Sequence, residues 1–374
     1  MKSLRRIIAL ARKETLHIVR DPRSLYLALG MPLVLLVLFG FGVSFDMDHL
    51  PIAVIDEDRT PTSRALMDHV FSSGELELVS AGDLRAEDAS QLFERREAIG
   101  VLILPAGLEA DLARGRNVSV QLLLDGVDPN SAAQALGKAD VLLRVAARAI
   151  TSPGSVTLAP PIDVRVRTWF NPGSRSALFL VPGLAAYILA LVAVMLTSLT
   201  LAREWERGSM QQLFVTPVAR LEIVVGKLLP YLALGGVAVL LVLTAGAWIF
   251  DVPFRGDLSV LAVASVVFLV GMLGQGLLVS NVAKNQMVAT QLATMTSMLP
   301  SMLLSGFMFP IENMPAPLRA ISNVVPARYF IHLLRGVLLR GNGWPEVGTD
   351  IVALAIFAFV VLALGIARFP RVLA

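Results

Sequence analysis

The chain has 374 residues, 55% of them hydrophobic, and a net charge of only +3. A soluble domain is typically about 45–50% apolar, so this composition favours a membrane protein. There is no cysteine, which excludes disulfides, thiolate metal sites and cysteine catalysis, and the four histidines are too scattered to share a metal ion.

Six long apolar stretches contain no Asp, Glu, Lys, Arg or His, and each is about as long as an α-helix that crosses a ~30 Å hydrocarbon core. We therefore predict a polytopic α-helical membrane protein with six transmembrane helices. Carriers driven by ion gradients usually keep an ionisable residue in the membrane, so energy is expected to enter this protein from outside the bilayer. The stretches are residues 25–43, 176–202, 228–250, 258–280, 287–309 and 351–367.

Residues 1–24 are basic and amphipathic, which predicts a cytoplasmic helix lying in the membrane interface. Its apolar positions are Leu4, Ile7, Ile8 and Ala11. Asp21-Pro22 should end this helix before the first span. The alternative for residues 1–24 is an ordinary basic flank. The first span, residues 25–43, is expected to be a signal-anchor helix that is retained and not cleaved.

The distribution of basic residues predicts the orientation of the spans. With the N-terminus inside, the cytoplasmic segments hold 14 Lys or Arg, whereas the two later outer loops hold 5. Positive residues favour the cytoplasmic side, so both termini are expected there. Residues 44–175 then lie outside the membrane.

This outer segment, residues 44–175, reads as an α/β domain between helices 1 and 2. Short apolar strands alternate with helical patterns, and Ala-rich residues 131–150 predict a long helix. The predicted strands are residues 51–58, 75–79, 99–104, 118–124 and 162–169. Asp56, Glu57 and Asp58 allow a cation site, but acids that follow a buried strand are more typical of turns and helix caps.

The second cytoplasmic segment, residues 203–227, begins as a continuation of the second span. It carries Glu204, Glu206 and Arg207, then the helix breaker Gly208, and a short amphipathic piece before Thr216-Pro217. A short rigid helix of this kind fits a groove in a soluble partner, although an ordinary loop with solvated charges has the same pattern. The pattern G-x-x-x-x-G-K-[ST] is absent, so a separate polypeptide must bind any ATP that drives this protein.

The order of these features resembles the permease subunits of ABC type-2 exporters over essentially the whole chain. Those proteins carry a coupling helix between spans two and three, headed by E-x-G-[TS], and Glu206-Arg207-Gly208-Ser209 matches it with Ser where Thr is common. PIAVIDEDRTPTSRAL and DGVDPNSA resemble the outer insert of the multidrug-type branch. The resemblance implies coupling to an ATPase subunit through Glu204, Glu206, Arg207, Gly208, Ser209, Leu213, Thr216 and Pro217.

Before the last span, residues 310–341 are rich in proline and predict two short amphipathic helices, residues 318–325 and 329–339. The resemblance implies a hairpin that re-enters the outer leaflet and forms an outer gate. Backbone at that depth must be shielded by protein or water. A surface loop with interfacial helices is the alternative. The gate residues would be Pro310, Pro315, Pro326, Arg328 and Arg335.

The predicted domain order is an interfacial helix (1–24), a first span (25–43), the outer α/β domain (44–175) and a five-helix transmembrane domain (176–374). By resemblance the chain is the permease subunit of an ATP-driven exporter of amphipathic, lipid-like or drug-like compounds in a bacterial inner membrane. It would carry no catalytic residue, metal or cofactor of its own, since ATP and Mg belong to the partner.

The implied partners are an ABC ATP-binding subunit, a second copy or related permease, and the lipid bilayer, with no nucleic acid; use of a periplasmic adaptor stays open. Two other functions fit the sequence. One is a non-transporting receptor or scaffold with an extracytoplasmic sensing domain. The other is an ion-coupled carrier, which the uncharged spans disfavour.

Overall fold

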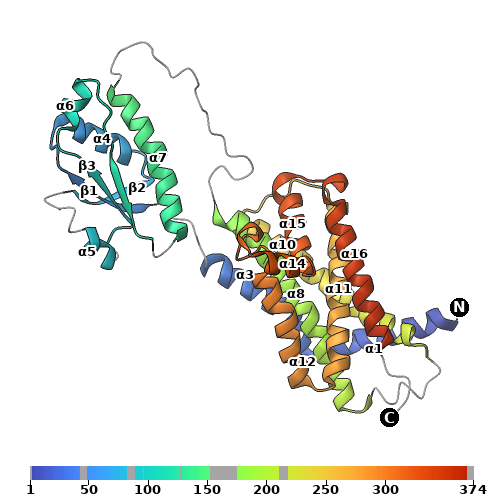
Figure 1. Cartoon of the computed structure of the whole chain (residues 1–374). Helices are drawn as coiled ribbons and strands as arrows, with labels where there is room; N and C mark the ends of the chain where they lie inside the picture. The colour runs from blue at the N-terminus through green and yellow to red at the C-terminus, as the bar shows by residue number, and fades with distance from the viewer. Residues whose placement is uncertain are drawn as a thin grey trace. The chain divides into compact units, whose positions relative to one another are not determined.

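The computed structural model describes residues 2–42, 49–81, 89–95, 97–126, 129–151, 175–209 and 218–368. The chain forms two compact units. The helical unit comprises Met1–Ser44 and Thr168–Ala374, and the other unit comprises Phe45–Arg167. Figure 1 shows the helices and strands of both units along the colour gradient.

Among the described residues, five helices are long and apolar enough to cross a membrane, which confirms a helical membrane protein with several spans. The first consists of α2 (Pro22–Leu25), a π-helical turn η1 (Tyr26–Gly30) and α3 (Met31–Gly42). The others are α8 (Ser176–Glu206), α10 (Arg220–Phe250), α11 (Leu258–Ala283) and α16 (Trp344–Ala367).

The predicted span at residues 287–309 differs from its prediction. It is helical as α12 (Gln286–Ala293), the π-helical turn η3 (Thr294–Met298) and α13 (Leu299–Leu303), and it ends well before residue 309. This run is about 27 Å long at 1.5 Å per residue, slightly short of the hydrocarbon core. The absence of charge marked the stretch, but did not indicate where the helix ends.

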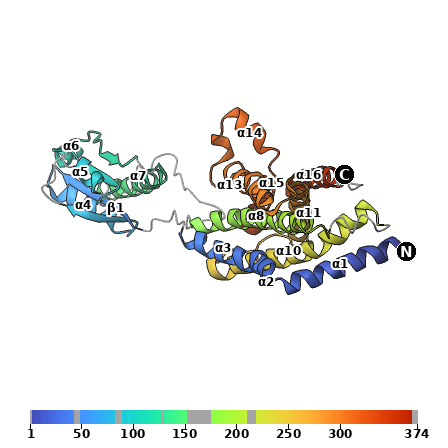
Figure 2. The ribbon, with the colours of Figure 1, turned by 90° about the horizontal axis from the view of Figure 1, so that it is seen from below.

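The N-terminal helix α1 (Lys2–Arg20) ends where the sequence predicts, at the Asp21-Pro22 pair. Asp21 caps α2, because its side chain accepts a hydrogen bond from the backbone N–H of Arg23 (3.1 Å), and Pro22 occupies the first helical position. Figure 2 shows α1 running alongside α10 up to this break.

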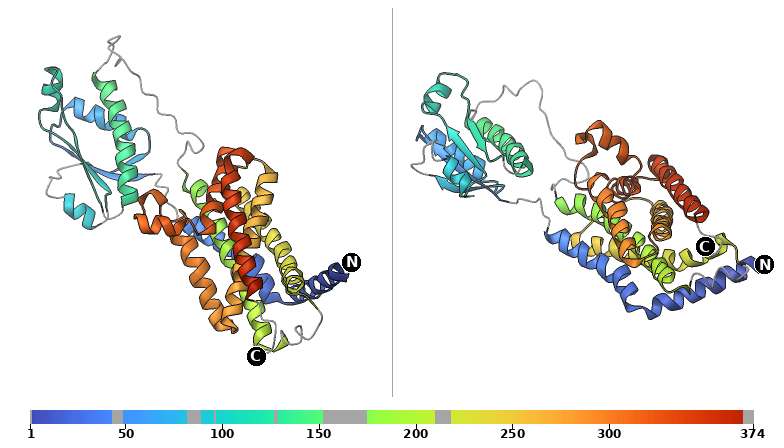
Figure 3. Two further views of the ribbon diagram at one scale, coloured as in Figure 1. Left: turned by 45° about the vertical axis from the view of Figure 1, so that its right-hand side comes forward. Right: turned by 60° about the horizontal axis from the view of Figure 1, so that its bottom comes forward.

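The central helix of the unit is α8, which packs against α3, α10, α11, α12 and α15 (Figure 3). In its most apolar window 89% of the residues are buried, against 28% in α10 and in α16. In Figure 1 the C-terminal ends of α8 and α16 lie at the same end of the unit as α1. That end also joins the start of α10 to the end of α16, since Arg220 donates to the Ala367 carbonyl at 3.3 Å.

The segment between α13 and α16 contains short helices, several of which start at a proline. Pro310 and Pro315 precede η4 and α14, and Pro326 is the first residue of α15, a position where its missing N–H costs nothing. The helix α15 is buried, and its Phe330 ring stacks on Phe268 of α11 at 4.0 Å between centroids. The elements are η4 (Ile311–Asn313), α14 (Ala316–Ser322), α15 (Pro326–Arg335) and η5 (Gly336–Arg340).

The second unit is a four-stranded sheet with strand order β2-β1-β3-β4. Strand β1 pairs parallel with β2 and β3, whereas β4 pairs antiparallel with β3. The strands are β1 (Leu50–Asp56), β2 (Leu76–Ala81), β3 (Gly100–Leu104) and β4 (Gln121–Leu124), and the helices are α4 (Pro61–Phe71), α5 (Ala89–Glu94), α6 (Leu108–Ala113) and α7 (Pro129–Thr151).

Both faces of this sheet are covered, because successive side chains of a strand point to opposite faces. On one face, Ile52 and Val54 pack with residues of α4 and α7. On the other face, Ala53 and Ile55 pack with Leu92 of α5. The α/β character agrees with the sequence; α5 and α6 are too short to show a clear period, and the predicted strand at 162–169 lies outside the described residues.

The acids that follow β1 act as caps. The Asp56 carboxylate accepts hydrogen bonds from the Ser63 hydroxyl (2.6 Å) and the Arg59 N–H (3.0 Å). Asp58 accepts from the backbone N–H of Gly107 (2.8 Å) and of Glu109 (3.1 Å), at the start of α6. The turn-and-cap interpretation therefore holds, and the described residues contain no cluster of His, Asp and Glu that would hold a metal ion.

Candidate coupling site at the end of the bundle near the N-terminal helix

The E-x-G-S element forms the end of α8. Gly208 has φ +70°, a left-handed conformation in which glycine ends helices at little cost. Its N–H donates to the Trp205 carbonyl (3.2 Å), and the Ser209 hydroxyl donates to the Glu204 carbonyl (3.3 Å). The two small residues of the motif therefore satisfy carbonyls at the helix end and set the direction in which the chain leaves α8.

The glutamate of this element reaches α12. One carboxylate oxygen of Glu206 accepts from the backbone N–H of Gln286 (2.8 Å), in the first turn of α12, and the other accepts from the Gln286 side-chain amide. An N–H in the first turn of a helix has no partner within the helix, so Glu206 acts as a cap supplied from another element. The end of α8 is thereby bound to the start of α12.

Next to it, a buried ionic cluster joins three helices. The Lys227 ammonium of α10 lies 2.9 Å from Glu14 of α1 and 2.5 Å from Glu204 of α8. The side chains of Lys227 and Glu14 are only 4% and 2% exposed. Ion pairs this buried are destabilising to break, because the remaining charge loses both water and partner. We call Glu14, Lys227 and Glu204 the ionic cluster.

Two further contacts hold α1 against α10. Gly226 leaves room for the helix, because a Cβ there would lie 2.8 Å from the Leu10 Cβ and 3.2 Å from the Ile7 carbonyl. Arg6 lies 3.5 Å from the carboxylate of Glu222. The glycine and lysine that precede the third predicted span thus bind the N-terminal helix.

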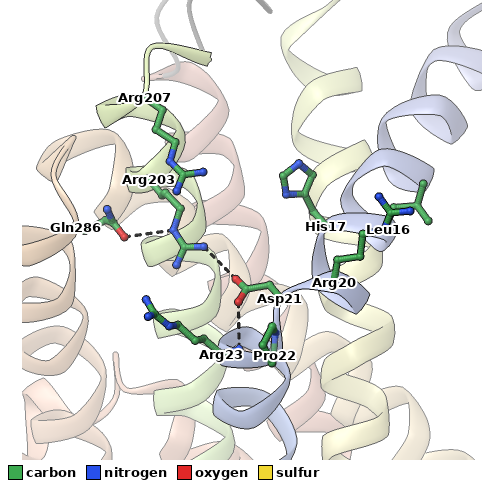
Figure 4. Close-up of a pocket in the computed structure, with 9 residues that line it drawn as sticks. All are labelled: Leu16, His17, Arg20, Asp21, Pro22, Arg23, Arg203, Arg207 and Gln286. Atoms are coloured by element: carbon green, nitrogen blue, oxygen red, sulfur yellow. Dashed lines mark hydrogen bonds and ion pairs between the residues drawn. The ribbon is translucent and has the colours of Figure 1, made fainter.

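Figure 4 shows how Asp21 extends this arrangement to the start of the first span. Arg203 of α8 donates to the Asp21 carboxylate (3.0 Å) and, through Nε, to the Gln286 side chain (3.3 Å). Burial favours a higher pKa for Asp21, but hydrogen bonds from Ser24, Arg203 and the backbone outweigh it, so the pKa lies below its ordinary value. Asp21 is therefore ionised at neutral pH and pairs with Arg203.

The structure thus gathers part of the predicted coupling set. Glu204 and Glu206 turn inward to α10 and α12, Gly208 and Ser209 end the helix, and Arg207 lines a pocket beside them. Leu213, Thr216, Pro217 and the short helix predicted around them lie outside the described residues. Sequence reasoning missed Glu14, Asp21, Lys227 and Gln286, whose partners are far away in the chain. A single acid among the basic residues of α1 was the one available signal for Glu14.

At the other end of α8, Arg335 ties the predicted gate to the bundle. It donates to the carbonyls of Gly306 (3.1 Å) and Phe179 (3.3 Å), and its guanidinium lies 3.8 Å from the centroid of the Phe179 ring. Arg328 instead braces the turn between α14 and α15, donating to Ser322 (2.6 Å) and Asn323 (2.7 Å). Pro310, Pro315 and Pro326 lie at the starts of η4, α14 and α15.

His332 and Asp350 join α15 to the start of α16. The ring Nδ1 lies 2.7 Å from the carboxylate, and this hydrogen bond to Asp350 raises the pKa of His332. Burial and the charges of Arg340 and Arg335 oppose the rise without cancelling it. A protonated His332 therefore strengthens this joint.

Apolar helices long enough to cross a membrane, joined at one end by buried charged side chains, define a multi-pass membrane protein. The sequence comparison gives the family. The chain belongs to the ABC-2 family transporter proteins, whose sequence model matches residues 23–367. It is a permease of that family, which confirms the resemblance drawn from the coupling element and the order of the spans.

Two similar proteins come from Escherichia coli strain K12. The probable multidrug ABC transporter permease YbhS is 37% identical over 343 residues, covering 91% of this chain and 90% of that protein. The probable multidrug ABC transporter permease YbhR is 28% identical over 343 residues, with 90% of each chain covered. The linearmycin resistance permease protein LnrN of Bacillus subtilis is 19% identical over 390 residues, covering 97% and 99%.

Proposed function

We propose that this chain is the membrane subunit of an ATP-driven exporter in a bacterial inner membrane, and that a separate subunit binds and hydrolyses the ATP. The observation that carries the proposal is the attachment of the E-x-G-S helix end to α1, α10 and α12 through buried or capping carboxylates. A push on residues that follow Ser209 would reach three helices at once. The chain itself would supply no catalytic group, metal or cofactor.

Six spans, with both termini inside and the α/β unit outside, are part of this proposal. The span beyond the five long apolar helices, fifth in chain order, would be the α12–α13 run, which ends within the outer leaflet. In support, Phe307 of the following turn stacks on Tyr187 at 6.0 Å, and Tyr187 lies about three turns inside α8. Residues 310–341 would then form the re-entrant outer gate, with backbone shielded by α8 and α11.

The proposed cargo is amphipathic, lipid-like or drug-like. Several hydroxyl groups of the spans are committed to their own helices, donating to carbonyls one turn back, so they offer a strongly polar cargo little. These are Thr197, Thr200, Thr294 and Thr296. The names of the two Escherichia coli relatives, multidrug permeases, agree with such a cargo.

The test uses the full permease in nanodiscs with the candidate ATP-binding subunit, ATP and Mg. Glu206→Ala removes the acceptor for Gln286 and should abolish most of the stimulation of ATPase activity by the permease. Glu346→Ala is the control, because Glu346 also accepts a backbone N–H at the start of a helix, that of Gly343 (2.8 Å), but within its own helix α16 and at the other end of the bundle. It should leave the stimulation unchanged.

Unchanged stimulation in Glu206→Ala would show that the coupling assignment is wrong. Failure of any ATP-binding subunit to co-purify with the chain would favour the alternative function, a membrane receptor or scaffold whose α/β unit senses an external ligand. Two permease chains, identical or related, are expected in the complex. Association with a periplasmic adaptor would appear in the same purification.

A further inference from the structure

A pocket of ≈ 640 Å³ opens between the C-terminal end of α1 and that of α8. Its volume is that of a small-molecule site. Three segments that are distant in sequence surround it: the end of α1 with the break that follows it, the last turn of α8, and Gln286 at the start of α12. Figure 4 shows Arg203 and Arg207 extending from α8 toward the space that His17 faces from α1.

The charges of this pocket do not balance. Four arginines line it, Arg20, Arg23, Arg203 and Arg207, against the carboxylate of Asp21, and Glu206 beside Gln286 offsets part of the charge of Arg203 and Arg207. That carboxylate is already used by Arg203, Ser24 and the Arg23 backbone. Within the described ranges, the guanidinium groups of Arg20, Arg23 and Arg207 make no hydrogen bond or ion pair. Like charges held together at the edge of an apolar bundle repel one another, so a bound anion would stabilise this arrangement.

The donors that remain suit a phosphate. Arg203 uses Nε for Gln286 and one Nη1 hydrogen for Asp21, which leaves three of its five N–H donors. Guanidinium groups bind phosphate with two parallel hydrogen bonds, and Arg207 is one helical turn from Arg203 on the same face of α8. Asp21 keeps Arg203 turned toward the pocket.

The location indicates a lipid as the source of the phosphate. The helix α1 carries exposed apolar side chains, Leu4, Ile8, Leu16 and Val19, and the first span exposes Tyr26 just beyond the break. An amphipathic helix buries such side chains at the boundary of headgroups and acyl chains. The pocket, at the junction of α1 and the first span, then lies at the level of the headgroups.

We propose that this pocket binds the phosphate of an anionic phospholipid headgroup, with Arg203 and Arg207 as its main donors and Arg23 beside them. The acyl chains lie along the exposed apolar face of α2 and α3. The bound lipid ties α1 to the end of α8, next to the ionic cluster. The site depends on α1 lying at the membrane surface and not on the identity of the exported compound.

The experiment measures which lipid the full purified chain retains in detergent, by native mass spectrometry after equal exposure to phosphatidylglycerol and phosphatidylcholine. Wild type should retain phosphatidylglycerol preferentially. Arg207→Gln and Arg23→Gln should each lower that retention about fivefold, the loss expected for one basic residue at an anionic surface. Arg368→Gln is the matched control, because Arg368 caps the end of α16 as Arg207 caps the end of α8, outside this pocket.

Melting temperature without lipid shows that each variant is folded before its retention is compared. Equal retention of phosphatidylglycerol by wild type and Arg207→Gln overturns the proposal, as does an equal loss in Arg368→Gln. A separate arm adds inorganic phosphate to lipid-stripped protein. A rise in melting temperature that needs Arg207, without selective retention of phosphatidylglycerol, would assign the pocket to a soluble anion and overturn the lipid assignment.

Discussion

At the scale of single residues, Lys227 joins α1, α8 and α10 at one end of the bundle. It is the one ammonium between the two carboxylates of the ionic cluster, with Lys13 at their edge, 3.9 Å from Glu204. Removing ions from water costs several kcal/mol for each ion, and close pairing offsets this only while all partners remain. The cluster therefore contributes the specific placement of α1, α8 and α10 more than net stability.

Lys227→Met should destabilise the chain by about 3–5 kcal/mol, since it leaves the buried carboxylates of Glu14 and Glu204 with only the half-exposed Lys13 near them, 4.0 Å and 3.9 Å away. Thermal unfolding of the full chain in detergent measures the effect. Lys13→Met is the control, because the Lys13 side chain is 47% exposed and its pairs should contribute only about 0–1 kcal/mol. Equal loss in the two variants would contradict a special role for the cluster.

His332 should make stability depend on pH. Its pKa in the folded chain is raised above the ordinary 6.5 by Asp350, so its contribution is complete below about pH 6.5 and is lost as pH rises through the folded value. We expect the melting temperature of wild type to fall, as the pH rises above about 6.5, more steeply than that of His332→Gln. Exposed His69, changed to Gln, should leave the slope as in wild type; identical slopes in all three would refute the assignment.

Sequence alone predicted the residues of the coupling element that act locally. Gly208 and Ser209 complete a helix end within five residues, and such caps are visible in a motif. Lys227 and Glu14 are 213 positions apart, and no spacing rule joins residues across that distance. The inward orientation of Glu204 and Glu206 was also not predictable, because it depends on where α10 and α12 pack.

At the scale of elements, absence of charge located the helices well, but not their ends. The helix α10 begins at Arg220, eight residues before its predicted span, because Glu222 and Lys227 are neutralised by α1 and α8 instead of facing water. The helix α13 ends at Leu303, before the end of its predicted span, because the apolar residues that follow form a turn. Its turn packs against α8 through Phe307, so apolar residues there serve a loop.

Gly226→Val should displace α1 from α10, since a side chain at that position overlaps Leu10 and the Ile7 carbonyl. The chain has no cysteine, so a single Ile18→Cys reports the change. Ile18 is buried in wild type, and a maleimide should label the cysteine several-fold faster in the Gly226→Val background. Gly236→Val, on the same helix with open space around it, should leave labelling slow. Fast labelling in both backgrounds would show that the space at Gly226 is not what holds α1 against α10.

At the scale of the whole molecule, the chain divides into a helical unit and an α/β unit, each with its own core. The α/β class of the second unit was predictable, since alternating strands and helices leave a clear pattern. The antiparallel addition of β4 was not, because pairing direction is decided by how the chain returns.

The proposed topology gives a direct labelling test. Ser72→Cys, exposed after α4, should react with a membrane-impermeant maleimide in intact spheroplasts. Thr15→Cys, exposed on α1, should react only after the membrane is permeabilised. Native cysteines do not interfere, since there are none. Labelling of Thr15→Cys in intact spheroplasts would show that α1 lies outside the cytoplasm and would contradict the proposed topology.

The burial of α8 has a consequence for biogenesis. The ribosome delivers α8 before α10, α11 and α15, the helices that later enclose it, so the newly made segment must stand in lipid with most of its surroundings not yet synthesised. The buried hydroxyl groups of α8 do not need the later helices as hydrogen-bond partners. Thr197 and Ser198, although buried in the finished bundle, donate to the Ala193 and Met195 carbonyls of α8 itself at 3.2 Å. The hydroxyl groups of α8 therefore have hydrogen-bond partners in lipid before the neighbouring helices are synthesised.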